Sequence, residues 1–190
     1  MLNSLRNNTS VALEHKFNIH QPESSAAIAD ALLSIIRASG VCGKDIIVLC
    51  IGTDRSTGDA LGPLTGSKLQ SLRFHPHIFG TLENPVHATN LTDTLNSIQQ
   101  SFRHPFIIAV DACLGRLENV GYVSLGHGPL KPGAGVNKDL PHVGDAYITG
   151  IVNVAGFMEH LVLQSTRLSL VVKMADAIAS GLAYSLGDLN

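Results

Sequence analysis

Two hydrophobic patterns alternate along the chain and predict alternating strands and helices. Short apolar, β-branched runs such as residues 45–51 and 106–110 are typical of strands that are covered on both faces of a parallel sheet. Apolar residues at helical spacing, as at Ile28, Leu32 and Ile36, predict amphipathic helices between these runs. The predicted strands are residues 45–51, 77–82, 106–110, 120–125 and 147–154, and the predicted helices are residues 26–40, 59–72, 90–102, 157–165 and 168–186.

This order of elements predicts a three-layer α/β/α fold around a mostly parallel central sheet. Residues 120–125 follow Asp111 too closely for a helical crossover, which favours an antiparallel strand at one edge of the sheet. Residues 1–22 are polar and have no sustained period, so we expect an N-terminal arm there. The remaining residues, 23–190, have the size of a single α/β domain.

Composition excludes several classes of function. The formal charge of −2 comes from basic and acidic residues that are scattered along the chain, without the basic run that nucleic-acid binding needs. No uninterrupted apolar run reaches the roughly 18 to 20 residues that span a bilayer, and the first residues lack the pattern of a secretory signal, so we expect a cytoplasmic protein. Three cysteines without regular spacing argue against a disulfide framework and a zinc cluster.

Candidate chemistry lies where two predicted strands end. Residues 46–63, reading IIVLCIGTDRSTGDALGP, and residues 105–116, reading PFIIAVDACLGR, each place an Asp after an apolar run. Ligands in α/β folds bind beyond the carboxyl ends of neighbouring strands, so Asp59 and Asp111 are expected to share one site. Two carboxylates that share a site hold one proton between them, an arrangement that suits activation of water for amide hydrolysis.

Other interpretations of the same residues remain open. Asp59 could merely stabilise the start of a helix, and Asp54 could stabilise the turn that contains it. The loop GTDRSTGDALG has neither the G-x-G-x-x-G spacing nor the Gly-Lys-Ser/Thr ending of phosphate-binding loops. Cys113 fits a small core residue better than a nucleophile. The loop histidines, which could bind a metal with the two aspartates but match no local ligand motif, are His87, His127 and His142.

The two junctions, together with residues 131–154, resemble the YyaC family of sporulation proteins, which is related to the germination protease and shares a fold with hydrogenase-maturation proteases. The resemblance implies a catalytic pair at Asp59 and Asp111. We expect no cofactor. The segment PGAGVN, residues 132–137, is similar to a PGSGVGN-type loop near the active site of the protease. We expect substrate to bind at the first glycine loop and at the PGAGVN segment. The residues concerned are Gly52, Thr53, Asp54, Gly58, Gly133, Gly135 and Asn137.

The sequence therefore predicts an aspartate-dependent peptidase of sporulation or germination. Its partner would be a peptide or a small protein, such as the small acid-soluble spore proteins. Backbone N–H groups of residues 52–58, or of the helix start that follows, are expected to stabilise the oxyanion. One alternative is a catalytically silent sporulation factor that binds a peptide or protein on the same fold. Another is a metal-dependent maturation-type protease, for which His142 and His87 are weak candidates as ligands.

Overall fold

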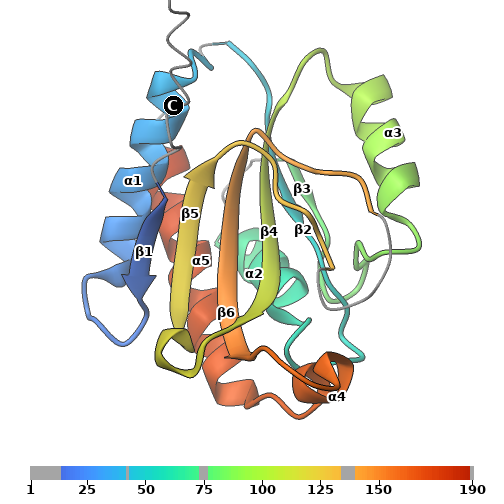
Figure 1. Ribbon diagram of the computed structural model, residues 1–190. Helices are drawn as coiled ribbons and strands as arrows, with labels where there is room; N and C mark the ends of the chain where they lie inside the picture. The colour runs from blue at the N-terminus through green and yellow to red at the C-terminus, as the bar shows by residue number, and fades with distance from the viewer. Residues whose placement is uncertain (1–13, 42, 73–76, 134–139, 189–190) are drawn as a thin grey trace, which may run out of the picture.

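The computed structural model describes residues 14–41, 43–72, 77–133 and 140–188 (Figure 1). Its six-stranded sheet has the strand order β1-β5-β6-β4-β2-β3. The elements are β1 (His15–Asn18), α1 (Ser24–Ala38), β2 (Ile46–Cys50), α2 (Leu61–Ser71), β3 (His77–Phe79), α3 (Leu91–Ser101), β4 (Phe106–Gly115), the 3₁₀ helix η1 (Leu117–Asn119), β5 (Tyr122–His127), β6 (Ala146–Val154), α4 (Glu159–Gln164) and α5 (Leu168–Gly187).

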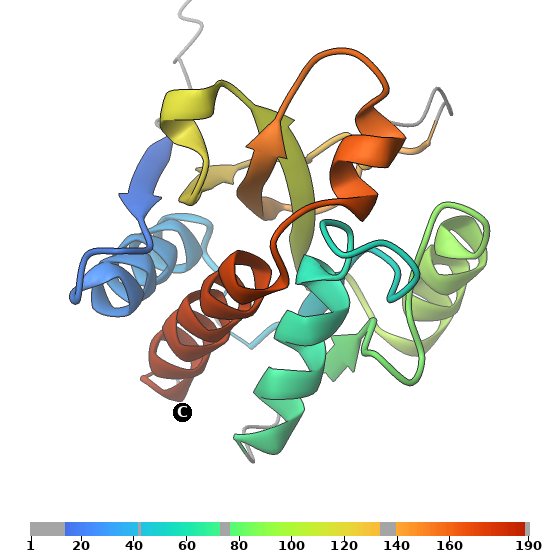
Figure 2. The same cartoon turned by 90° about the horizontal axis from the view of Figure 1, so that it is seen from below.

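Helices cover both faces of the sheet, as predicted. Helices α1, α2 and α5 lie side by side on one face, and α3 lies on the other (Figure 2). Strand β2 supplies both layers, because Val48 and Cys50 pack on the first face and Ile47 and Leu49 on the second. A strand buried on both sides must be apolar at every position, which is why this run shows no alternation with polar residues.

The sheet is mostly parallel, with one antiparallel strand near an edge. Strands β3, β2, β4 and β6 pair in parallel, whereas β5 is antiparallel to both β6 and β1. The predicted fold class is confirmed. The expected arm needs a correction at His15–Asn18, which pair with β5 as an edge strand of the domain. Residues 1–13 of the arm lie outside the described residues. A four-residue edge strand in which no residue is fully buried carries little periodicity for a sequence pattern to reveal.

Strand β4 is longer than the apolar run that predicted it. Pairing with β2 ends where Cys50 lies opposite Val110, but β4 continues to Gly115 along β6, with an irregularity after Cys113. Asp111 therefore lies inside β4 and not at its end, which corrects the prediction. It remains the first β4 residue beyond the partner strand β2, and so it borders the space above the carboxyl end of β2.

Within the described part of the chain, α5 is the one helix long and apolar enough to cross a membrane by length and composition. More than half of its apolar window is buried in the structure, where its residues join those of α1 in the hydrophobic core.

Candidate active site

The glycine loop after β2 folds back on itself. Gly52 has a φ of +147°, and a Cβ atom there would collide with the carbonyl oxygen of Asp59. The adjacent Thr53 N–H donates to this same oxygen at 3.2 Å, and the Gly52 N–H donates to the carbonyl of Val86 at 2.8 Å. Glycine is required at position 52 because the backbone approaches so closely. The loop therefore brings Asp59 back beside the end of β2.

A second anchor ties the loop to α4. The Gly58 N–H donates to the carbonyl of Leu163 at 2.8 Å, and a Cβ at position 58 would lie 2.8 Å from a methyl group of Leu163. The Arg55 N–H donates to the Thr53 hydroxyl at 3.3 Å, so Thr53 and not Asp54 supports this turn. The N–H groups of Gly52, Thr53 and Gly58 all donate within the protein, so these three are not free to stabilise an oxyanion in this conformation. The prediction stays open for the other N–H groups of the loop and for the helix start.

Asp59 lies between this loop and α2. The Ala60 N–H donates to the carbonyl of Ser56 at 3.0 Å, which closes a single helical turn around Asp59 before the helix begins at Leu61. Burial raises the pKa of the Asp59 carboxyl above its ordinary value, and the nearby Ser56 hydroxyl opposes part of that rise. Desolvation thus outweighs the local polar contact.

Asp111 is the most perturbed carboxyl group that the structure describes. Its residue is only 8% exposed. One oxygen accepts the N–H of Ala112 at 2.8 Å, and the other accepts the N–H of Gly133 at 3.4 Å. Burial raises its pKa from 3.8 to about 7, the two backbone bonds lower it, and the negative charge of Asp59 raises it further.

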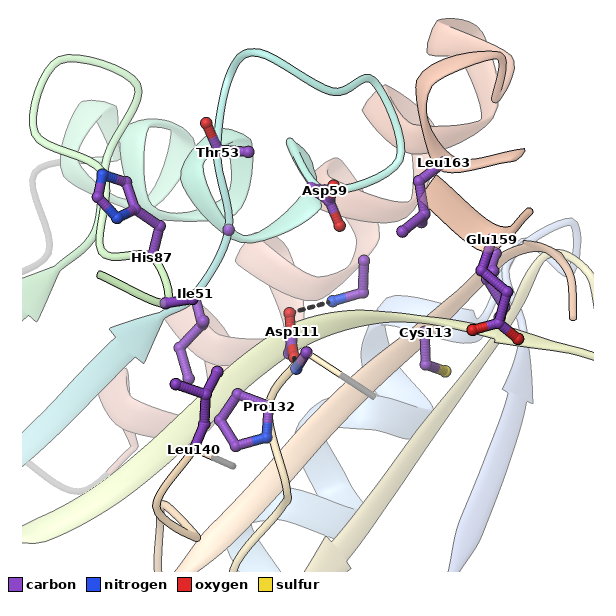
Figure 3. A pocket seen from close by; sticks show the side chains of 15 residues that line it. Ile51, Thr53, Asp59, His87, Asp111, Cys113, Pro132, Leu140, Glu159 and Leu163 are labelled. Atoms are coloured by element: carbon purple, nitrogen blue, oxygen red, sulfur yellow. Dashed lines mark hydrogen bonds between the residues drawn. The ribbon is translucent and has the colours of Figure 1, made fainter. Parts of the chain in front are cut away.

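The two aspartates face one pocket of about 280 Å³ (Figure 3). Asp59 reaches it from the loop and Asp111 from β4, with their carboxyl groups pointing toward one another. The other lining residues are Ile51, Gly52, Thr53, His87, Ala88, Ala112, Cys113, Leu114, Pro132, Gly133, Leu140, Glu159 and Leu163. Most of these walls are apolar, which explains why the carboxyl groups keep their protons more readily than in water.

The predicted substrate-binding residues divide into three groups. Gly52, Thr53 and Gly133 line the pocket. Asp54 is exposed and Gly58 is buried under Leu163, and neither lines it. Gly135 and Asn137 lie outside the described residues.

Two ionisable lining residues, Cys113 and Glu159, were not predicted as site residues. Cys113 lies two positions after Asp111 and therefore projects from the same face of β4, a signal that the strand period contains once β4 is known to continue. Burial raises the pKa of its thiol to about 11, although Thr149 lowers it, so the thiol is neutral at physiological pH. Glu159 arrives from α4, and no local pattern links it to the two aspartates.

The histidines named as weak metal candidates do not converge. His87 lines the pocket and its Nδ1 lies 2.9 Å from the Thr89 hydroxyl, whereas His142 and His127 are exposed and are not part of the lining. Across residues 14–41, 43–72, 77–133 and 140–188, no group of three or more His, Cys, Asp or Glu side chains is placed to hold a metal ion.

Comparison with known proteins supports both the family and the fold. Residues 16–181 match the family described as "Protein of unknown function (DUF1256)", and the chain belongs to this family. It is 56% identical over 165 residues to the uncharacterized protein YyaC of Bacillus subtilis strain 168, which covers 85% of this chain and 80% of that protein. A [NiFe] hydrogenase maturation protease, HycI from Thermococcus kodakarensis KOD1, has a similar fold, with a TM-score of 0.54 at 17% identity over 83% of this chain and 99% of that one.

Proposed function

We propose that this member of the DUF1256 family is an aspartate-dependent peptidase in which Asp59 and Asp111 activate water to hydrolyse an amide bond. The observation that carries the proposal is the position of Asp111, buried opposite Asp59 with a pKa raised to about 7. A carboxyl group that titrates near neutral pH in a pocket is a candidate general acid or base. The protease-like fold supports the same reaction class.

The pair would work as one unit that holds a single proton at neutral pH. The ionised carboxylate takes a proton from water as the oxygen attacks the peptide carbonyl, while the protonated carboxyl donates to the carbonyl oxygen. Collapse of the tetrahedral intermediate breaks the C–N bond, and a proton passes to the leaving amine. A protonated carboxyl can polarise the carbonyl directly, so this scheme does not need the engaged N–H groups of Gly52, Thr53 and Gly58.

The proposed substrate is a peptide or a small protein of sporulation or germination in the bacterial cytoplasm, with small acid-soluble spore proteins as the first to test. The family resemblance supports this choice of process. The pocket supports a peptide substrate, because about 280 Å³ of mostly apolar space can take a side chain beside a scissile bond.

The test is cleavage of spore-protein peptides, followed by mass spectrometry, with purified protein and two single variants. Asp111→Asn and Asp59→Asn should each lower kcat/KM by at least a hundredfold, because each removes a group that moves a proton in the transition state. Asp54→Asn is the matched control, since this exposed Asp of the same loop does not line the pocket. Cleavage that survives unchanged in Asp111→Asn would exclude the mechanism.

One observation favours a second candidate, a binding protein without turnover. The N–H groups of Gly52, Thr53 and Gly58 donate to backbone carbonyls, so these three groups do not form a preformed oxyanion hole. A protein of this kind would bind a peptide in the pocket without cleaving it. Saturable peptide binding that Asp59→Ala weakens, with no cleavage products across a peptide library, would support this candidate over the peptidase.

A further inference from the structure

The hydroxyl group of Ser56 is buried without a hydrogen bond of good geometry. The residue is 9% exposed, and its Oγ atom has no bonded partner in the part of the chain that the structure describes. Buried side-chain hydroxyls nearly always have a partner, because leaving one unpaired costs free energy. An unpaired hydroxyl in a loop that is otherwise tied down at several points therefore calls for a specific reason.

Helix capping does not supply that reason. The sequence from Ser56 to Asp59 matches the capping-box pattern, in which the first side chain accepts the N–H three residues later. In the structure Ser56 Oγ makes no such bond, and α2 begins only at Leu61, without a side-chain cap. The Ser56 carbonyl, and not its hydroxyl, accepts the N–H of Ala60. The hydroxyl thus remains available for another group.

The acceptor that this hydroxyl can serve is the Asp59 carboxyl. Ser56 and Asp59 are three residues apart on one closed helical turn, which places their side chains on the same side. The hydroxyl is close enough to lower the Asp59 pKa, although the two groups are not in hydrogen-bond geometry. A small rotation of the hydroxyl-bearing side chain would complete the bond once Asp59 carries a full negative charge.

Among the residues that the structure describes, no stronger donor lines the pocket beside Asp59. The other titratable groups around the pocket are Asp111 and Cys113 from β4, Glu159 from α4 and His87 after β3. The described lining contains no Lys or Arg, and the two charged neighbours in the loop, Asp54 and Arg55, are exposed. Asp111 in contrast already accepts two backbone N–H groups. These two donors favour the charged form of Asp111, but Asp111 is buried and Asp59 is only partly buried, and this difference in desolvation favours the proton on Asp111.

We infer that Ser56 is a positioning residue that donates a hydrogen bond to ionised Asp59, so that Asp59 is the base and Asp111 holds the proton. This inference rests on the proposed peptidase function and assigns the two roles within it. Asp59 takes the proton from water, which weakens its bond with Ser56, and Asp111 gives its proton to the carbonyl oxygen. The buried hydroxyl would stabilise the charge before the reaction and would be left unpaired only when Asp59 is neutral.

The decisive experiment is a carbon-13 NMR titration of the Asp59 carboxyl in the full-length protein and in Ser56→Ala. The Asp59 pKa should rise in the variant, because the donor to the charged form is gone. Thr57→Ala is the matched control, since it removes a hydroxyl from the neighbouring residue of the same loop, which does not line the pocket. An Asp59 titration that does not move in Ser56→Ala, or that moves equally in Thr57→Ala, would overturn the inference.

Kinetics add a second readout. The acid limb of the pH profile of kcat/KM should shift to higher pH in Ser56→Ala, with rates on the acid side about two- to tenfold lower, as expected for loss of one hydrogen bond. Ser56→Thr keeps the hydroxyl and should restore the limb. A purely structural role predicts lower thermal stability with an unshifted limb, and that result would refute ours.

The two proposals can fail separately. The NMR titration needs no turnover, so it tests the Ser56–Asp59 contact even if no peptide is cleaved. Cleavage that is lost in Asp111→Asn but has an unshifted acid limb in Ser56→Ala would keep the peptidase and remove the role of Ser56. If Ser56→Ala does not fold, Ser56→Cys replaces it, because a thiol of similar size is a weak donor and should also raise the Asp59 pKa.

Discussion

Ionisation of Asp111 should destabilise the folded protein, and replacing this residue by Asn should remove the effect. In the unfolded chain the carboxyl titrates near its ordinary pKa of 3.8, whereas in the folded protein burial raises the pKa to about 7. Between these values the unfolded state releases a proton that the folded state keeps bound. The stabilising contribution of the neutral group is therefore fully present below pH 3.8 and is lost as the pH rises through 7.

The size of the effect follows from the same two pKa values. Each pH unit between them is worth about 1.4 kcal/mol, so Asp111 should lower the free energy of unfolding by about 4 kcal/mol between pH 4 and pH 8. In Asp111→Asn the amide oxygen can still accept the Ala112 N–H, but the amide group cannot accept the N–H of Gly133. The variant should thus be about 1 kcal/mol less stable at pH 4 and about 3 kcal/mol more stable at pH 8.

The assay is urea unfolding of both proteins at intervals from pH 4 to pH 8. Far-UV circular dichroism is the suitable probe, because the chain has no tryptophan. The difference in unfolding free energy between the two proteins isolates Asp111, since most other carboxyl groups contribute equally to both. Asp54→Asn, an exposed substitution outside the pocket lining, is the matched control. If the difference in unfolding free energy between the wild type and Asp111→Asn does not change from pH 4 to pH 8, Asp111 is not a neutral buried acid. That result would refute the reasoning.

Three further predictions concern the same pocket. Peptide cleavage should fall as the pH rises through about 7, because Asp111 then loses its proton, and a kcat/KM that stays constant from pH 6 to pH 9 would contradict this. Gly52→Ala should cost several kcal/mol in thermal unfolding, since its Cβ meets the Asp59 carbonyl, whereas Gly128→Ala, at a positive φ with open space, should cost about 1 kcal/mol. Iodoacetamide should label Cys113 slowly at pH 7.5 and much faster at pH 10, because burial raises its pKa to about 11; equal peptide labelling by mass spectrometry at both values would count against this.

Expectations from the sequence were most accurate where a residue's neighbours in the chain decide its structure. The apolar run before Gly52 predicted β2, and the order of strands and helices predicted the layers of the fold. Expectations were wrong where partners come from elsewhere in the chain. Strand β4 continues past Asp111 because β6 pairs with it, and residues 15–18 form a strand because β5 offers an edge. Neither partner is visible in the local pattern.

The sequence by itself determined that two carboxyl groups, Asp59 and Asp111, follow the apolar runs of neighbouring parallel strands. The parallel pairing of β2 with β4, which the structure shows, brings the two junctions together at one edge of the sheet. Only the tertiary structure decided how each group behaves. Burial and two backbone donors set the pKa of Asp111, and Leu163 of α4 accepts the N–H of Gly58 in the Asp59 loop. Desolvation and hydrogen-bond geometry depend on atoms far apart in the chain, so no sequence pattern contains them.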